Sequence, residues 1–274
     1  GEVAWYSAGR RRVTTDTTAF SDVTDRPELQ ILSARLVEVD GRYSVVGELL
    51  NTDADPADVT VTAYLYDEDG EVLTWYNAQN IIMHKLFPKE TTPFRIDFEG
   101  VAGLALGDEA TAGEFDPHAY SPISLDEPIA SFEVYAKAVL TKDDLYRDLT
   151  VQQMEIDTQG GVSYLTGELY NNGTLEATIP HILVTYYDEN NEVVWVDHQF
   201  LEAAVKPQRS RPFAVPVTPL KAVETVLKRG DVYANILQEE ASAESDWRLR
   251  MPLPDELGYD SVRTSVHYFV GGVK

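Results

Sequence analysis

The chain has 274 residues, enough for two domains or one large one. Hydrophobic residues make up 43% of it, as packed cores require, and acidic residues outnumber basic ones 46 to 22, for a net charge of -24. A surface this negative repels phosphate backbones and anionic membrane faces, so we expect no nucleic-acid partner. Because there is no cysteine, thiolate metal sites, disulfides and cysteine nucleophiles are excluded.

The charge is carried by many short carboxylates and only 8 lysines, which suits a surface that stays hydrated in concentrated salt. A halophilic source and an ordinary acidic protein both fit this composition. No apolar run reaches the roughly 18 residues that predict a transmembrane segment. A secretion signal or lipid anchor upstream of Gly1 would leave no trace in these residues.

Residues 1–28 are polar, with three consecutive arginines and many threonines. This composition predicts a stalk or tail, with one added strand as the alternative.

An internal repeat organises the rest of the chain, since four landmarks recur in the same order about 120 positions apart. We therefore predict two copies of one domain, at 29–145 and 146–274, the second with a C-terminal extension. The landmarks are a Gly-Glu-Leu segment ending in Asn (47–51 and 167–171), a hydrophobic strand with Tyr-Asp-Glu (64–68 and 185–189), a Glu-Val segment (71–73 and 192–194) and a Pro-Phe pair (93–94 and 212–213).

Each copy has the period-2 alternation of β-strands. Val59, Val61 and Leu65 alternate with polar or aromatic residues, which predicts a strand with one buried face. A turn follows at 67–70, in which Gly70 can take a positive φ, and Asn191 replaces it in the second copy. Further strands are predicted at 43–49, 72–76, 94–98, 131–140, 165–169, 182–186, 213–217 and 231–238.

Two segments interrupt this pattern. Residues 100–129 are rich in Gly, Ala, Asp and Pro without periodicity, and predict a long surface loop inserted in the first copy. A short helix is expected at 219–227, ended by Gly230. Short strands at regular spacing predict an all-β fold: two tandem immunoglobulin-like antiparallel β-sandwich domains.

At these landmarks the chain resembles the FxLYD family. The resemblance rests on a Gly-x-Leu-x-Asn strand, on Leu65-Tyr66-Asp67 (Tyr186-Tyr187-Asp188 in the second copy), and on the later Pro-Phe pair. It implies small extracytoplasmic β-sandwich domains of a largely uncharacterised family, commonly secreted or lipid-anchored, and brings no catalytic residues.

The landmark residues also have structural explanations. A Gly inside a strand, as at Gly47 and Gly167, permits a bulge or a close contact with a bulky neighbour. We expect the side chains of Asn51 and Asn171 to bond turn backbone, and Asp67 to open its hairpin in the same way, as does Asp188 in the second copy.

Acidic loops are candidate calcium sites, because Ca²⁺ prefers carboxylate oxygens. A solvated hairpin turn is the favoured interpretation, since no EF-hand loop is present. The candidate ligands are Asp67, Asp69 and Glu71 in the first hairpin, and a second acidic loop contains Asp53, Asp55 and Asp58.

The five histidines show no metal-binding spacing and no HExxH motif, which favours scattered histidines over a zinc cluster. No G-x-S-x-G, G-x-G-x-x-G or Walker loop is present either. The histidines are His84, His118, His181, His198 and His267.

Trp75 and Trp195 lie near equivalent positions in the two copies. Buried, they belong to the sandwich cores, which is the favoured interpretation; exposed, they can stack on sugar rings or a partner protein. Residues 172–174 (Asn-Gly-Thr) form a glycosylation sequon in an expected turn.

These patterns predict a non-enzymatic extracytoplasmic binding or spacer protein, without catalytic residues or cofactors, whose partner is a protein or glycan at the cell surface. Two alternatives stay open. One is a carbohydrate-binding or enzyme-accessory module using Trp75 or Trp195. The other is a metal-dependent site at the domain interface, with His84 or His198 near the inserted loop.

Overall fold

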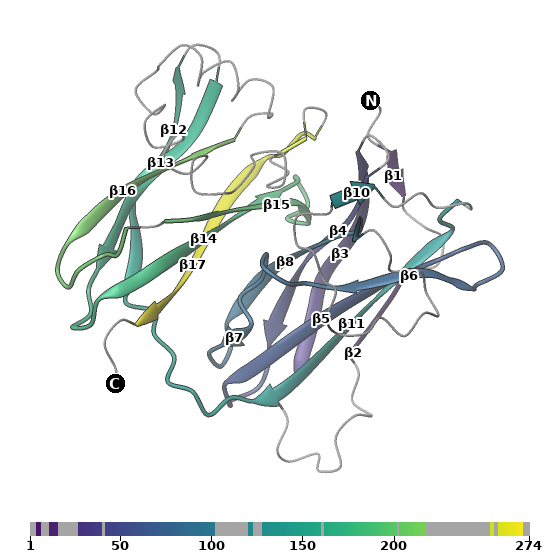
Figure 1. Ribbon diagram of the computed structural model, residues 1–274, viewed down its shortest axis with the longest axis horizontal. Helices are drawn as coiled ribbons and strands as arrows, with labels where there is room; N and C mark the ends of the chain where they lie inside the picture. The colour runs from purple at the N-terminus through teal and green to yellow at the C-terminus, as the bar shows by residue number, and fades with distance from the viewer. Residues whose placement is uncertain are drawn as a thin grey trace. The chain divides into compact units, whose positions relative to one another are not determined.

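The computed structural model describes residues 4–6, 11–15, 27–39, 42–101, 120–122, 128–159, 162–201, 203–217, 253–254 and 257–270, and every regular element there is a strand (Figure 1). The all-β prediction is confirmed. The chain divides into two compact units: Gly1–Asp143 with Tyr187–Trp195, and Asp144–Tyr186 with Val196–Lys274. In the described ranges, no helix is long and apolar enough to cross a membrane.

Two large sheets and one short two-stranded sheet lie in the first unit, and their strands mostly pair antiparallel. In the first sheet the order is β1-β3-β4-β8: β1 (Ala4–Tyr6), β3 (Leu29–Val39), β4 (Arg42–Asn51) and β8 (Thr91–Asp97). In the second sheet it is β2-β11-β5-β6, with β7 also on β5: β2 (Arg11–Thr15), β11 (Ser131–Leu140), β5 (Ala57–Tyr66), β6 (Val72–Asn77) and β7 (Lys85–Leu86). Within this sheet β2 pairs parallel with β11, and the other pairs are antiparallel.

The core of the first unit follows the predicted alternation. On β5, Val59, Val61, Ala63 and Leu65 are fully buried, whereas the polar and aromatic residues that alternate with them are half-buried or exposed. From the first sheet, Leu49 and Phe94 are likewise fully buried. Burying one face of each sheet is the main favourable term for such a fold.

The described part of residues 1–28 contains two short strands, where the sequence predicted a stalk or tail with one added strand as the alternative. Both strands join the sheets, because β1 pairs with β3 and β2 with β11. Sheet edges present unpaired backbone N–H and C=O groups, which an extended polar segment can satisfy.

The inserted segment at 100–129 also differs from the expected structureless loop. A short antiparallel pair forms at its ends, between β9 (Glu99–Val101) and β10 (Tyr120–Pro122). The residues between them, the helix expected at 219–227 and the strand expected at 231–238 lie outside the described residues.

The second unit also contains two sheets. One has the order β12-β13-β16: β12 (Leu149–Gln159), β13 (Val162–Asn171) and β16 (Ser210–Pro216). The other has the order β15-β14-β17: β14 (Ala177–Tyr187), β15 (Val193–Phe200) and β17 (Ser261–Val270). The sequence pattern assigned no strand to β17, because its residues lie in the C-terminal extension and its side chains are all half-buried or exposed.

The predicted roles of the landmark residues are confirmed in both units. Gly47 pairs with Phe94 and Gly167 with Phe213, so the phenylalanine of each Pro-Phe pair lies opposite a glycine on the neighbouring strand. The Asn51 side chain donates to the carbonyls of Asp55 and Phe87 and accepts from the Asp53 amide. In the second unit, Asn171 donates to the carbonyls of Leu175 and Val205 and accepts from the Gly173 amide.

The two hairpin turns also share one geometry. The Asp67 Oδ1 accepts the amides of Asp69 and Glu71, at 2.9 and 2.8 Å. Gly70 has a φ of 83° and Asn191 a φ of 57°, as predicted.

Candidate functional site

The sheet β2-β11-β5-β6, whose strands Figure 1 shows, carries a group of aromatic side chains on the face turned away from the core. The β5 residues Ala63 and Leu65 point into the core, so the alternation turns Tyr64 and Tyr66 to the other face. Register then completes the surface, because Tyr64 pairs with Trp75 of β6 on one side and with Glu133 of β11 on the other. We call the rings of Tyr64, Tyr66, Trp75 and Tyr135 the aromatic face.

Tyr64 is the centre of this face. Its ring stacks with those of Trp75 and Tyr66, at centroid distances of 6.1 and 6.4 Å and interplanar angles of 28° and 25°. Tyr135 meets it edge-on, at 5.4 Å and 85°. Such pairs contribute beyond simple area burial, so the rings hold one another in place.

Glu133 ties two of these tyrosines together. The Tyr66 hydroxyl donates to Glu133 Oε2 at 2.9 Å, and the Tyr135 hydroxyl donates to the same oxygen. Burial raises the pKa of Tyr66, and the hydrogen bond to Glu133 raises it further, since both disfavour a phenolate. Tyr66 therefore stays a neutral donor at ordinary pH.

The two tryptophans occupy different environments, although their strands are equivalent. Trp75 is 46% exposed, whereas Trp195 is fully buried. The guanidinium of Arg95 lies over the Trp195 ring, 4.7 Å from its centroid, in a cation–π contact. Of the two candidate ligand-binding rings, only Trp75 is presented to solvent.

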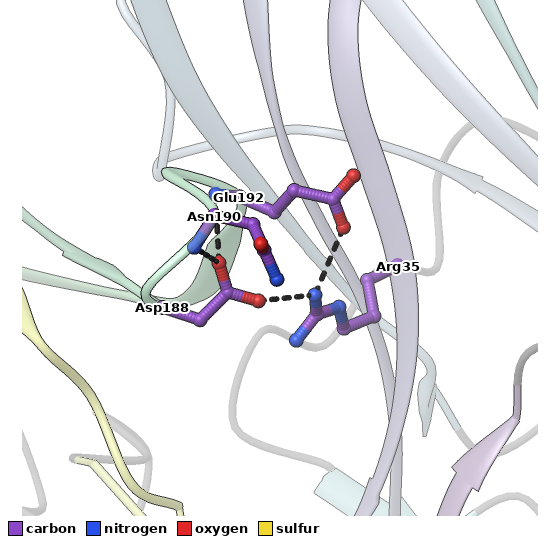
Figure 2. A network of polar contacts seen from close by, with 4 residues as sticks. All are labelled: Arg35, Asp188, Asn190 and Glu192. Carbon is purple, nitrogen blue, oxygen red and sulfur yellow. Dashed lines mark hydrogen bonds and ion pairs between the residues drawn. The ribbon is translucent and has the colours of Figure 1, made fainter.

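The segment Tyr187–Trp195 of the first unit also carries a polar network around Arg35 (Figure 2). One Arg35 nitrogen donates to Asp188 Oδ2 at 2.9 Å and to Glu192 Oε2 at 3.0 Å. Asp188 uses its other oxygen to accept the amides of Asn190 and Glu192. Burial raises the pKa of Asp188, but the hydrogen bonds from Arg35 and the two amides outweigh it and leave this pKa lowered.

The acidic turns serve as backbone caps. The Oδ1 of Asp67 is occupied by two amides of its own turn. Asp53 behaves alike, since its carboxylate accepts the amides of Glu28, Ala54 and Asp55. These contacts agree with the solvated-turn interpretation of both loops. Across the described residues, no group of three or more histidines or carboxylates could hold a metal ion.

The sequon lies in the turn after β13, where Asn172 is exposed. The backbone amide of Asn172 donates to the carbonyl of Asp148, so the turn is anchored while the residue stays exposed to solvent.

The histidines are not all scattered, which corrects the expectation from their spacing. His181 of β14, His198 of β15 and His267 of β17 meet on adjacent strands of the second unit. His84 lies apart in the first unit, with its ring nitrogens 2.9 and 2.8 Å from the carbonyl oxygens of Val59 and Gln79. His118 lies outside the described residues.

We call the three joined side chains the histidine chain. His181 Nδ1 lies 2.6 Å from His267 Nε2, and His181 Nε2 lies 2.9 Å from His198 Nδ1. The central ring thus uses both nitrogens, each toward a different partner, so one metal ion could not bind all three rings in this arrangement. Burial lowers the pKa of His181 well below its usual value, and the two neighbouring histidines lower it further.

Sequence reasoning missed the joined residues of both sites. For the histidine chain one signal exists: His181 and His198 are nearly equidistant from the hairpin turn at 188–192, which places them opposite each other on paired strands. His267 has no such signal, because β17 comes from a distant part of the chain. The outward alternation of Tyr64 and Tyr66 could have indicated the aromatic face.

Comparisons with known proteins add little to this geometry. No protein family matches the chain, and no curated protein matches it either. Among solved structures, the chain is similar to red sea bream transglutaminase, with a TM-score of 0.20 and 8% identity. The match covers 70% of this chain and only 26% of that enzyme, and a similarity of this size carries no argument.

Proposed function

We propose that this protein is a non-enzymatic, extracytoplasmic binding module whose aromatic face takes neutral glycans. The observation that carries this proposal is the 46% exposure of Trp75 at the end of a row of packed tyrosine rings. A large aromatic side chain left in water costs hydrophobic free energy that a ligand can recover. An extracytoplasmic location is supported by the sequence resemblance described above.

The shape of the face suits a sugar chain. The rings of Trp75, Tyr64 and Tyr66 come from two adjacent strands and lie within 28° of parallel in each stacked pair. The apolar C–H face of a pyranose ring can pack against an indole, as any planar ligand can stack on an aromatic side chain. The surface spans three strands and therefore fits an extended ligand.

Polar groups lie beside the rings, where sugar hydroxyls would need them. In the next row across the sheet, the Thr62 hydroxyl of β5 donates to the side-chain oxygen of Asn77 at 2.6 Å, and Tyr135 of β11 pairs with Thr62. A few placed polar groups among apolar rings are the usual composition of a small-ligand site. They support hydroxyl-rich ligands over purely apolar ones.

Charge favours a neutral glycan over an anionic one. The chain carries a net charge of -24, and Glu133 lies within the aromatic face. Uronic-acid, sulfated or phosphate-bearing chains would be repelled by this field. Nucleic-acid bases could also stack on the rings, but their phosphates would meet the same repulsion.

The face is also preorganised. Glu133 holds the hydroxyls of Tyr66 and Tyr135, and Tyr64 packs between Tyr66 and Trp75. Side chains that are already ordered lose less entropy when a ligand binds. This ordering supports recognition by a rigid platform.

The test is affinity electrophoresis and calorimetry of the full chain with neutral polysaccharides chosen from a glycan array. Trp75→Ala should weaken binding by about tenfold, the effect typical of losing one stacking ring. Phe87→Ala is the matched control, because Phe87 is 36% exposed in the same unit but lies outside the aromatic face. This control should bind like the original chain.

Two results would overturn the proposal. One is a glycan array on which the unmodified chain binds no neutral glycan. The other is equal loss of binding in Trp75→Ala and Phe87→Ala, which would indicate nonspecific adhesion.

A further inference from the structure

We infer that the histidine chain is a proton-binding site that makes the retention of strand β17 in its sheet dependent on pH. The inference concerns the second unit and is independent of the proposed glycan site, which lies in the first.

The arrangement accounts for its protons when all three rings are neutral. Each contact between ring nitrogens needs one N–H donor and one bare acceptor. With neutral rings, His267 Nε2–H donates to His181 Nδ1, His181 Nε2–H donates to His198 Nδ1, and His198 carries its proton on Nε2. The two hydrogen bonds can equally run in the opposite direction, from His198 through His181 to His267. In either arrangement the His181 ring donates one hydrogen bond and accepts one.

One additional proton leaves both contacts intact. If His267 gains it, that ring still donates to His181, and His181 still donates to His198. If His198 gains it instead, both donations reverse. An outer ring is the favoured acceptor of this proton, because His181 is only 2% exposed and pays the full desolvation cost of a charge.

A second proton breaks the chain. With five protons on three rings, one contact must place two N–H groups against each other, at 2.6 or 2.9 Å. The two outer rings are then both positive, and each lies against the buried central ring, at centroid distances of 4.8 and 5.1 Å. Both effects push an outer strand away from β14.

The strand that separates from β14 is β17. A short turn joins β14 to β15, which keeps His198 near His181 even when their contact is lost. β17 has no such covalent neighbour, lies at the other edge of the sheet, and buries none of its side chains completely. Besides backbone pairing, it is tied by the Thr178 hydroxyl, which donates to the carbonyl of Phe269 at 3.0 Å, and by the Tyr268 oxygen, which accepts the amide of Asp148 at 2.8 Å.

Among the described residues, the charged groups that act on the pKa of His181 are its two neighbours, His198 from β15 and His267 from β17, and both lower it. Phe200 stacks on its ring at 3.9 Å and is neutral. Asp197 precedes His198 on β15, so its side chain lies on the opposite face of the strand. This carboxylate is fully buried and accepts the backbone amide of His198.

The experiment is amide hydrogen exchange of the full chain at pH 7.5 and 5.0, expressed as protection factors so that the intrinsic pH effect is removed. In the unmodified protein, the β17 amides should lose at least tenfold in protection at the lower pH, relative to the amides of β13. His267→Gln cannot take up the second proton, so its β17 protection should change less than threefold between the two pH values.

Thr178→Ala is the matched control, since it removes another β14–β17 contact without changing any titration. It should lower β17 protection at both pH values and keep the pH dependence. Should His267→Gln fail to retain β17, nitrogen NMR of the unmodified imidazoles decides: uptake of the second proton must coincide with the loss of β17 protection. Protection that is independent of pH, or equally dependent on it in His267→Gln, would overturn the inference.

Discussion

The ring of Phe94 occupies the space that a side chain on Gly47 would need. A Cβ built on Gly47 would lie 2.5 Å from Phe94 Cζ and 2.2 Å from the carbonyl oxygen of Ser33. Gly167 and Phe213 repeat the relationship less tightly, because the nearest ring atom would be 2.9 Å away and the nearest backbone oxygen, that of Gln152, 3.0 Å. The close approach of strand and ring therefore leaves no room for a side chain at Gly47 and little room for one at Gly167.

Gly47→Ala should destabilise the fold more than Gly167→Ala. The first clash involves a backbone oxygen that cannot move independently, and we expect a loss of about 2–3 kcal/mol in the free energy of unfolding. For Gly167→Ala, small shifts relieve the contact, and about 1 kcal/mol is expected. Urea unfolding measures both, and an equal effect of the two substitutions would contradict this explanation.

Asp67 should stabilise its hairpin through hydrogen bonds rather than through a cation. Asp67→Ala removes the acceptor of two turn amides and should cost about 1 kcal/mol. Because a bound ion would stabilise the folded state, calcium should leave the melting temperature of the unmodified protein unchanged. A rise in melting temperature with calcium that disappears in Asp67→Ala would show a metal site instead.

Asp188 should make stability depend on pH in the acid range. Its lowered pKa means that the unfolded chain binds the proton first as the pH falls. The stabilising contribution is therefore complete above about pH 4, the ordinary range of an aspartate, and is lost as the pH falls through the lower folded pKa.

The measurement is urea unfolding at about pH 6 and about pH 3, with Asp188→Asn as the comparison. The substitution should reduce stability at the higher pH and have less effect at the lower one. A carboxyl carbon titration by NMR checks the direction of the shift directly, and a raised pKa for Asp188 would contradict the role of Arg35.

Glu133 should control both the ionisation of Tyr66 and the order of the aromatic face. Glu133→Gln removes the negative charge that opposes a phenolate, so the pKa of Tyr66 should fall toward its ordinary value of about 10. Ultraviolet titration of the tyrosines follows this change, with Tyr66→Phe identifying the signal. Glycan binding should weaken several-fold, but less than in Trp75→Ala, because Glu133 orders the rings without being one of them. If Glu133→Gln leaves the tyrosine titration unchanged, the hydrogen bonds are not formed in solution.

Much of the fold could be predicted from local patterns. The alternation along 59–65 predicted β5 and its buried face, and 131–140 matched β11. Gly70 and Asn191 were assigned positive φ values from turn chemistry alone. These features depend on steric contacts and hydrogen bonds between residues that are only a few positions apart in the chain, so the local sequence predicts them.

The exposure of the two tryptophans and the pairing of the N-terminal segment could not be predicted in this way. Trp75 and Trp195 lie near equivalent positions of the two copies, yet Trp75 is 46% exposed whereas Trp195 is fully buried, with Arg95 over its ring. Residues 1–28 have the composition of a tail because the segment as a whole is polar and its two described strands are short, and these strands find their partners on two sheets formed by later residues.

Periodicity and turn residues in the chain thus established which segments are strands, which face of each is buried, and where the hairpins bend. The histidine chain and the aromatic face required the fold, because their members come from strands that are far apart in the chain. Which side chains meet across a sheet depends on strand order and register, and these are set by the packing of whole faces rather than by any short stretch of residues.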